Sequence, residues 1–140
     1  MALDNIFGIA GSALNAQTAR MNATASNLAN ASAVAGSEAT AFRAKRVTFK
    51  TIMEQQPNSP EINKGGVKVA GITDDPKPIS RMSDPGNPAA DKDGYVYLAN
   101  VNEMTEMVEM MAAARSYQNN VEVVNTARQL TLRTLDIIKS

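Results

Sequence analysis

The acidic residues are the first place to look for chemistry, because the chain contains no His and no Cys. Those two absences remove the usual general base near neutral pH, the commonest metal ligand and a thiolate nucleophile. Asp74 and Asp75 are neighbouring carboxylates, which can act as acid and base where burial raises one pKa. They precede Pro76 in an open, proline-rich stretch, so we expect no such burial. We find no catalytic constellation.

Two glycine-containing segments resemble ligand loops only superficially. Asp91-Lys92-Asp93-Gly94 is similar to a calcium loop, but its glycine comes too early and Asn102 stands where a closing glutamate is needed. A turn is the favoured interpretation. Lys64-Gly65-Gly66 lacks the spaced glycine and the following Ser or Thr of a phosphate-binding loop. We therefore predict no metal and no cofactor, and the chain is not expected to be an enzyme.

Two clusters of like charge have a functional and a structural interpretation. Glu103, Glu106 and Glu109 stand three residues apart and could bind a cation, but we favour a solvated or intersubunit acidic face. A basic cluster could hold phosphate, although a solvated strand face is favoured; it comprises Arg43, Lys45, Arg46 and Lys50. A small hydrolase using Asp74, Asp75 or the glutamate row is the weakest alternative.

The amino-acid composition argues against further classes of function. The chain has 140 residues, 4% aromatic residues, and 14 basic against 14 acidic residues, for a formal net charge of zero. This balance argues against nucleic-acid binding and against polybasic membrane attachment. No stretch approaches the ~20 apolar residues of a membrane span. The N-terminus lacks a basic region and is a poor secretory signal, so export would need a route without a cleaved signal.

Two long helices are expected at the ends of the chain. Asn100–Lys139 contains neither Gly nor Pro and is rich in strong helix formers. A helix of this length spans roughly 60 Å, whereas a compact domain of this size has a radius of gyration of roughly 14 Å. Such a helix needs a partner outside a compact globule, and the segment Leu3–Leu28 fits that role.

Apolar residues recur at helical spacing in both segments and define a predicted assembly seam. The N-terminal members are a strict heptad: Phe7, Leu14, Met21 and Leu28. The C-terminal members are Met107, Met111, Tyr117, Val121, Val124, Leu135 and Ile138, although Arg128 and Thr131 weaken this stripe. The methionine cluster either fills a core or forms an adaptable contact surface; it comprises Met104, Met107, Met110 and Met111.

The polar side of the N-terminal helix is also informative. It carries amide and hydroxyl groups, with Arg20 as its one charge. An uncharged face can lie against protein without burying unpaired charges, so we infer that this helix is packed on several sides. A mildly polar surface helix is the alternative. Asn27 and Asn30 are expected to satisfy backbone groups near the helix end, or to bridge subunits.

The middle of the chain indicates short strands and loops. Asn30–Ala41 is interpreted as a linker, Phe42–Ile52 as a half-buried strand, and Gln55–Asn63 as a loop. Further strands are expected from Gly65 to Ile72 and from Tyr95 to Leu98, separated by a proline-rich segment, Asp74–Pro88. The predicted fold is mainly α. Residues 1–30 plus 100–140 form a helical coiled-coil domain, and residues 31–99 form a small β-rich middle domain. Lateral packing of such helix pairs would build a rod or tube.

Both ends of the chain resemble the flagellar basal-body rod protein family. The N-terminal motif lies in Ser12–Ala31 and includes Gln17, Arg20, Ser26, Asn27 and Asn30. The C-terminal motif includes Glu106-Met107, Arg115 and Asn120. Three stretches, ALDNIFGIAGSAL, FRAKRVTFK and DPGNPAADKDGYVYLANVNEMTEM, narrow the resemblance to a proximal-rod member. The resemblance covers nearly the whole chain and is least typical in residues 51–64 and 72–82.

The resemblance implies a structural subunit of the proximal rod that assembles helically through its terminal helices. In this family the paired helices line the export channel, and the middle segment lies outside as part of the drive shaft. The implied partners are copies of itself, other rod proteins, and membrane-ring and export-apparatus components, with no nucleic acid and no small-molecule substrate. The implied location is the periplasmic rod of the basal body, reached through the flagellar type III apparatus without a cleaved signal peptide. The terminal helices are expected to be largely disordered in the free monomer. The alternative is a soluble coiled-coil adaptor or export chaperone.

Overall fold

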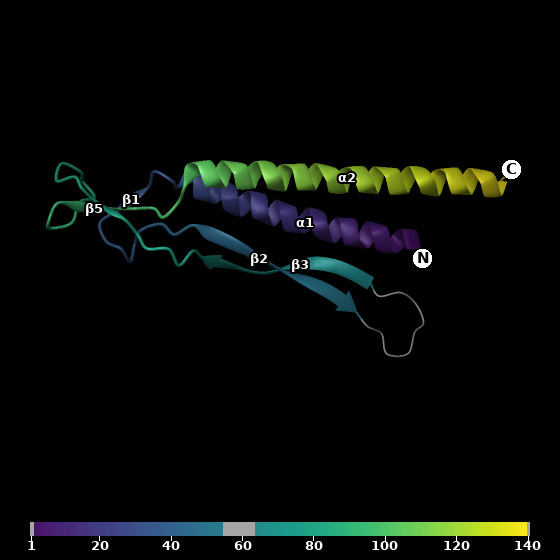
Figure 1. Ribbon diagram of the computed structural model, residues 1–140, viewed down its shortest axis with the longest axis horizontal. Helices are drawn as coiled ribbons and strands as arrows, with labels where there is room; N and C mark the ends of the chain where they lie inside the picture. The colour runs from purple at the N-terminus through teal and green to yellow at the C-terminus, as the bar shows by residue number, and fades with distance from the viewer. Residues whose placement is uncertain (1, 55–63, 140) are drawn as a thin grey trace.

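The computed structural model describes the backbone of residues 2–54 and 64–139, and the side chains of residues 5–52 and 65–137. The chain is elongated, with two long helices, a long hairpin and a small sheet (Figure 1). The elements in order are α1 (Ala2–Ala29), β1 (Val34–Ala35), β2 (Lys45–Glu54), β3 (Lys64–Asp74), β4 (Arg81–Ser83), β5 (Tyr95–Leu98) and α2 (Glu103–Lys139). The expectation of two terminal helices around a small β-rich middle is confirmed.

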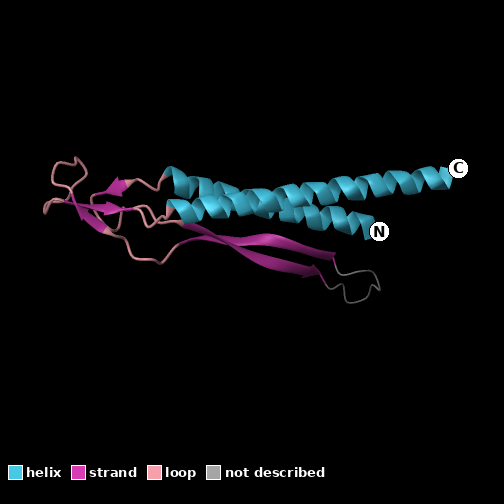
Figure 2. Cartoon of the chain, turned by 45° about the horizontal axis from the view of Figure 1, so that its top comes forward, coloured by secondary structure: helices cyan, strands magenta, loops and turns pink. Residues whose placement is uncertain are grey.

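The helices α1 and α2 lie side by side and run in opposite directions (Figures 1 and 2). Both chain ends are therefore at the same end of the molecule, where α2 continues beyond the start of α1. Helix α2 begins three residues later than expected because Asn102 caps it. The Oδ1 atom of Asn102 accepts a hydrogen bond from the Thr105 backbone N–H at 3.0 Å. An asparagine at this position satisfies one of the free N–H groups of a helix start.

Strands β2 and β3 form a long antiparallel hairpin in which Lys45 pairs with Asp74 and Glu54 pairs with Lys64. Its register shifts between Thr48 and Phe49. The hairpin packs along α1, so that α1 is the central layer between the hairpin and α2 (Figure 2). Strand β2 starts later than the predicted Phe42, because the hydrogen bonds of the Ala44 backbone go to Asn100 and Asp75. The expected loop Gln55–Asn63 lies outside the described residues.

A second sheet lies at the end of the molecule away from the chain termini (Figure 1). Its strand order is β1-β5-β4, with β5 central, and both pairings are antiparallel. Val96 in β5 is fully buried. The prediction of β5 is confirmed, as is the turn before it, where Gly94 has a φ of 77°. The sequence analysis missed β1, within the expected linker, and β4, within the proline-rich segment, because such short strands are set by pairing with β5.

The buried core is thin and consists mainly of small side chains. Its apolar members are Ala10, Ala16, Ala23, Ala41, Ala44, Val96, Ala113 and Ala127. Small residues allow the helix backbones to approach closely, but each buries little apolar area. The largest fully buried side chains include Glu106 and Asn27. Specific polar contacts therefore contribute much of what fixes the arrangement of the layers.

Candidate assembly surface

A polar cluster, which we call the polar junction, joins all three layers and consists of the buried Asn27, Asp75 and Glu106 and the half-buried Arg46. Asn27 in α1 is fully buried. Its Nδ2 donates to the Lys45 backbone oxygen at 3.0 Å, and its Oδ1 accepts from the Lys45 N–H at 2.7 Å. The same Nδ2 donates to Glu106 Oε2 in α2 at 2.9 Å. One amide thus pairs with the start of β2 as a neighbouring strand would, and also holds α2.

Arg46 connects the two acidic members of the junction. Its Nη1 donates to Glu106 Oε1 at 2.8 Å, and its Nε donates to Asp75 Oδ2 at 3.0 Å. The Glu106 side chain is 1% exposed and that of Asp75 is 8% exposed, whereas that of Arg46 is 36% exposed. These contacts correct two expectations. Glu106 does not belong to a solvated or intersubunit acidic face, and Arg46 is not simply a solvated strand residue.

The charges of the junction are stabilised by their hydrogen bonds. The Lys77 backbone N–H, followed by the Arg46 guanidinium, lowers the pKa of Asp75 against the opposing effect of burial. Burial alone would lower the pKa of Arg46, but its bonds and charge attraction to Asp75 and Glu106 outweigh burial and raise that pKa. Asp75 is therefore buried, contrary to expectation, yet its pKa moves away from the range of a general acid.

Asn100, which follows β5, ties the junction to the segments just before β2 and just after β3. Its Oδ1 accepts from the Ala44 N–H at 2.7 Å, and its Nδ2 donates to the backbone oxygens of Asp75 and Lys77 at 3.2 and 2.9 Å. The Asp75 N–H donates to the Ala44 oxygen at 2.7 Å. The sequence did not lead us to single out Asn100. Its position just before the helix cap Asn102 is the feature that could have indicated a structural role. The side-chain amide of Asn100 thus holds three segments together: the one before β2, the one after β3 and the one before α2.

The other residues of the two family motifs have varied surroundings. Arg20 pairs with Glu109 of α2 at 3.3 Å and lies over the Phe49 ring of β2, 5.8 Å from its centroid. Asn30 donates from Nδ2 to the Ser26 carbonyl at 2.8 Å, which satisfies a backbone group in the last turn of α1.

The remaining motif residues lie on α1 and α2. The Gln17 Oε1 is buried without a hydrogen-bond partner among the described residues. Asn120 donates to the Ser116 carbonyl at 2.8 Å. Arg115 is exposed. Within the part of the chain that the structure describes, none of these three side chains forms a hydrogen bond or ion pair between the layers, unlike Asn27 and Arg20.

The residues of the predicted seam divide into two groups. One group is half-buried and comprises Phe7, Leu14, Met21, Leu28, Tyr117 and Val124. The other is exposed and comprises Met107, Met111, Val121 and Leu135. Ile138 lies in α2, but its side chain is outside the described residues.

The face of α2 that packs on α1 differs from the predicted stripe. Its buried and half-buried positions recur four and three residues apart: Glu106, Met110, Ala113, Tyr117, Asn120, Val124, Ala127 and Thr131. The polar members Glu106 and Asn120 concealed this face in the sequence. The more apolar stripe lies to one side of it, and much of that stripe is open to solvent.

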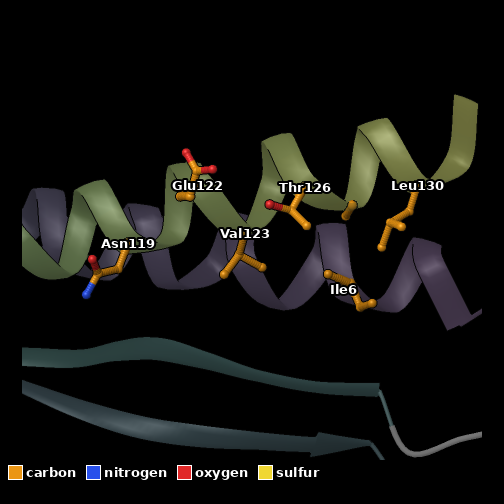
Figure 3. Close-up of a pocket in the computed structure, with 7 residues that line it drawn as sticks. Ile6, Asn119, Glu122, Val123, Thr126 and Leu130 are labelled. Atoms are coloured by element: carbon orange, nitrogen blue, oxygen red, sulfur yellow. The ribbon is translucent and has the colours of Figure 1, made fainter.

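Exposed apolar residues continue on α2 as a shallow groove beside α1. The groove has a volume of about 350 Å³ and is lined by Ile6 of α1 and by Asn119, Glu122, Val123, Thr126, Ala127 and Leu130 of α2. Figure 3 shows Val123 and Leu130 projecting from α2 on the side where Ile6 projects from α1. The lining is mostly apolar and provides no cluster of acids or bases.

The acidic residues form no metal or catalytic centre in the part of the chain that the structure describes. Among those residues, no group of three acidic side chains is placed to hold a metal ion. The Asp91 carboxylate instead accepts hydrogen bonds from the Asp93 and Tyr95 N–H groups at 2.9 and 2.8 Å, which makes the segment a turn. No described helix is long and apolar enough to cross a membrane.

Comparison with known proteins matches this chain at both ends and along its length. The family described as flagella basal body rod protein matches residues 7–36, and the family described as flagellar basal body rod FlgEFG protein C-terminal matches residues 92–137. The flagellar basal-body rod proteins FlgC of Yersinia enterocolitica and of Escherichia coli O157:H7 are each 50% identical over 137 residues. FlgC of Salmonella typhimurium is 49% identical over 137 residues. Each alignment covers 98% of both chains.

Proposed function

The chain belongs to the flagellar basal-body rod protein family, and from this premise we propose that its terminal helices pair as a coiled coil and assemble helically into the proximal rod. As a member of this family it is a structural subunit of the rod, and its relatives are named as rod proteins rather than as enzymes. The observation that carries the proposal is 50% identity over 98% of the chain to FlgC.

The elongated shape supports separate roles for the terminal helices and for the middle segment of the chain. We assign residues 1–30 and 100–140 to an inner helical domain and residues 31–99 to an outer domain. The antiparallel helices and the small sheet beyond one end of them support this division (Figure 2). The β2–β3 hairpin extends along α1, so part of the middle segment braces the inner domain. In the assembled rod the helices line the export channel and the whole subunit transmits torque.

The surface of α2 supports assembly through this helix. Met107, Met111 and Leu135 are 51%, 72% and 48% exposed, and an isolated chain gains nothing by leaving such residues in water. Neighbouring subunits would cover them. In this proposal the half-buried Phe7, Leu14, Met21 and Leu28 form the corresponding surface of α1.

The proposed partners are copies of this chain, other rod proteins, and ring and export-apparatus components at the rod base. The proposed location is the periplasmic part of the basal body, reached through the flagellar type III apparatus without a cleaved signal. A zero formal net charge supports self-association, because little long-range repulsion opposes close packing of subunits. Terminal helices that bury mainly alanine also support ordering on assembly, because ordering costs about 1–2 kcal/mol per residue for the backbone.

The proposal is tested by mass spectrometry of basal bodies purified from the organism that encodes the chain. A strain without the gene is the control. We expect the protein in the intact rod and a deletion strain that builds nothing beyond the membrane ring. Absence of the protein from basal bodies, together with normal swimming of the deletion strain, would overturn the proposed function.

A further inference from the structure

The end of the hairpin where β3 begins lies beside the first half of α1 (Figures 1 and 2). A hydroxyl group connects the two elements there. Ser12 Oγ donates to the Ile9 carbonyl oxygen within α1 at 2.7 Å, and it accepts from the Val67 N–H of β3 at 3.1 Å. The backbone of a helix and the backbone of a strand are thus joined through one serine. We call this contact the clasp, and it comprises Ser12, Gly66 and Val67.

The clasp favours a glycine at position 66. A Cβ atom added to Gly66 would lie 3.2 Å from Ser12 Oγ, which is closer than ordinary van der Waals contact. Ser12 Oγ is fixed by its two hydrogen bonds, so it cannot turn away without lengthening one of them. Gly65 is under less restriction, because a Cβ atom there would lie 3.6 Å from Ile9 Cδ1. The missing side chain at position 66 therefore lets β3 approach α1 closely enough for the bond.

The segment of α1 that the clasp holds has little helical stability of its own. Gly8 and Gly11 stand within the helix, and glycine lowers helix stability relative to alanine. Packing within the described part of the chain requires neither glycine, because a Cβ atom at either position would meet nothing within 4 Å. The buried apolar residue of this segment, Ala10, is small, and Ile6 and Ile9 are 38% and 43% exposed. Apolar burial therefore stabilises this segment only weakly.

The two halves of α1 are held to the hairpin at separate points. The second half is held at the polar junction, where Asn27 bonds to the Lys45 backbone and to Glu106. The first half is held at the clasp, where Ser12 bonds to the Val67 backbone. A helical segment with weak local preference depends on its tertiary contacts for order. The first half of α1 is such a segment, and the clasp is its specific polar contact with β3.

We propose that the clasp controls the folding of the first half of α1. With the clasp closed, residues 5–16 are helical. With the clasp open, this glycine-containing segment loses its helix, while the second half of α1 stays bound at the polar junction. The inference goes beyond the proposed function, because it assigns to the middle segment a role in ordering the N-terminal helix. It concerns a single chain and does not depend on contacts between subunits.

The direct test closes the clasp covalently in the full chain, which has no cysteine of its own. A Cβ atom at position 66 would lie 3.8 Å from Ser12 Cβ, within the range of about 3.5–4.5 Å that a disulfide needs. Ser12→Cys with Gly66→Cys is therefore expected to form a disulfide in oxidised glutathione. Ser12→Cys with Gly71→Cys is the matched control, because it closes a loop of similar length. A Cβ atom on Gly71 would meet nothing within 4 Å.

The readout is amide hydrogen exchange of residues 5–16, measured by mass spectrometry in trimethylamine N-oxide, which favours the folded state. The reduced form lacks the serine hydroxyl and leaves the clasp open. Forming the disulfide to position 66 should slow exchange in this segment roughly tenfold, and reduction should reverse the effect. The control disulfide should form more slowly and slow exchange by less than about twofold. Equal rates of disulfide formation, or exchange that closing the clasp leaves unchanged, would overturn the inference.

A substitution at the same position opens the clasp without cysteines. Gly66→Val places a branched side chain against Ser12 and should speed exchange of residues 5–16 roughly tenfold under the same conditions. Gly71→Val, on the same strand, has open space around its new side chain and should leave that exchange unchanged. Equal exchange of residues 5–16 in the two valine variants would contradict the proposal.

A rescue experiment separates control of the helix from general damage to the hairpin. Gly8→Ala with Gly11→Ala adds two methyl groups that fit without contact and strengthens the helix itself. Combined with Gly66→Val, this pair should restore most of the lost protection in residues 5–16, because the helix then needs the clasp less. Protection that stays as low as in Gly66→Val alone would show that the clasp does not act through the weak start of α1, and would overturn the inference.

Discussion

Replacing Arg46 with Met should destabilise the chain strongly, because it removes the one cation of the polar junction. The substitution keeps an unbranched apolar stem but leaves Glu106 and Asp75, whose side chains are 1% and 8% exposed, without a positive partner. Removing one partner of a buried ion pair typically costs about 3–5 kcal/mol. Arg46 is 36% exposed, so water can partly replace it. We therefore expect a loss of about 2–3 kcal/mol in the free energy of unfolding.

The assay follows the helical circular dichroism signal of the purified full chain in a series of solutions that runs from high trimethylamine N-oxide through plain buffer to high urea. The osmolyte favours the folded state and urea opposes it, so the midpoint is measurable whether or not the free chain is fully folded in buffer. With a urea dependence of about 1–3 kcal/mol/M, the expected loss moves the midpoint by about 0.7–3 M. The slope should not change, because the area exposed on unfolding stays the same.

The control is Lys45→Met, the neighbouring residue on the same strand and the same change in charge. Lys45 pairs with Asp74, but these side chains are 41% and 54% exposed, so the expected loss is below about 1 kcal/mol. A second control combines Arg46→Met with Glu106→Gln, which removes the charge that was left unpaired. The double variant should lose less than the sum of the single losses. An Arg46→Met loss no larger than that of Lys45→Met, or strict additivity with Glu106→Gln, would refute the reasoning.

Three further predictions concern the junction and the seam. Asn27→Ala should lower the free energy of unfolding by about 2–3 kcal/mol, because it leaves both backbone groups of Lys45 and one oxygen of Glu106 without their partner. The control Asn30→Ala should lower it by under about 1 kcal/mol. Equal midpoints of the two variants in the same denaturation assay would contradict this prediction. The pKa of Asp75 is lower in the folded chain than its ordinary value of 3.8, so the stability that its charge contributes is complete above that pH and is lost as the pH falls through the folded pKa. Unfolding measured between pH 6 and pH 2 should therefore show a smaller loss of stability in acid for Asp75→Asn than for the unaltered chain. Leu28→Asp or Val121→Asp should block rod assembly while leaving the monomer soluble, since each would bury an unpaired charge between subunits; normal swimming of either variant would count against the seam.

The long helices were predictable because their signals are local. The absence of Gly and Pro from residue 100 to residue 139 and the density of helix formers predict α2 without reference to any contact. Strand β5 was predictable for a similar reason, since an Asp-Gly turn precedes a run of β-favouring residues. These features depend on residues that are neighbours in the sequence, which is why pattern and propensity suffice for them.

The polar junction was not predictable, because its members are far apart in the sequence and each has an ordinary local explanation. Glu106 belongs to a row of glutamates that suits a solvated helix face, and Arg46 belongs to a basic cluster that suits a solvated strand. Only the packing of β2 against α1 brings them together, and Asn27 then pairs with both α2 and β2. A polar residue at a buried helix position cannot be distinguished from an exposed one by its type alone. For the same reason, the apolar stripe predicted for α2 differs from the face of α2 that packs on α1.

The junction also explains how a helix interface whose fully buried apolar residues are alanines can have a single register. Buried alanines alone distinguish weakly between neighbouring registers. A slip of α1 along α2 would separate Glu106 from Asn27 and Arg46 together, because these two residues are linked through the backbone of Lys45. A polar contact at one position fixes register at a cost in stability, as it does in coiled coils. The register in turn sets how far α2 extends beyond α1. The buried polar residues at one end of the helix pair therefore set how far α2 extends past the start of α1 at the other end (Figure 1).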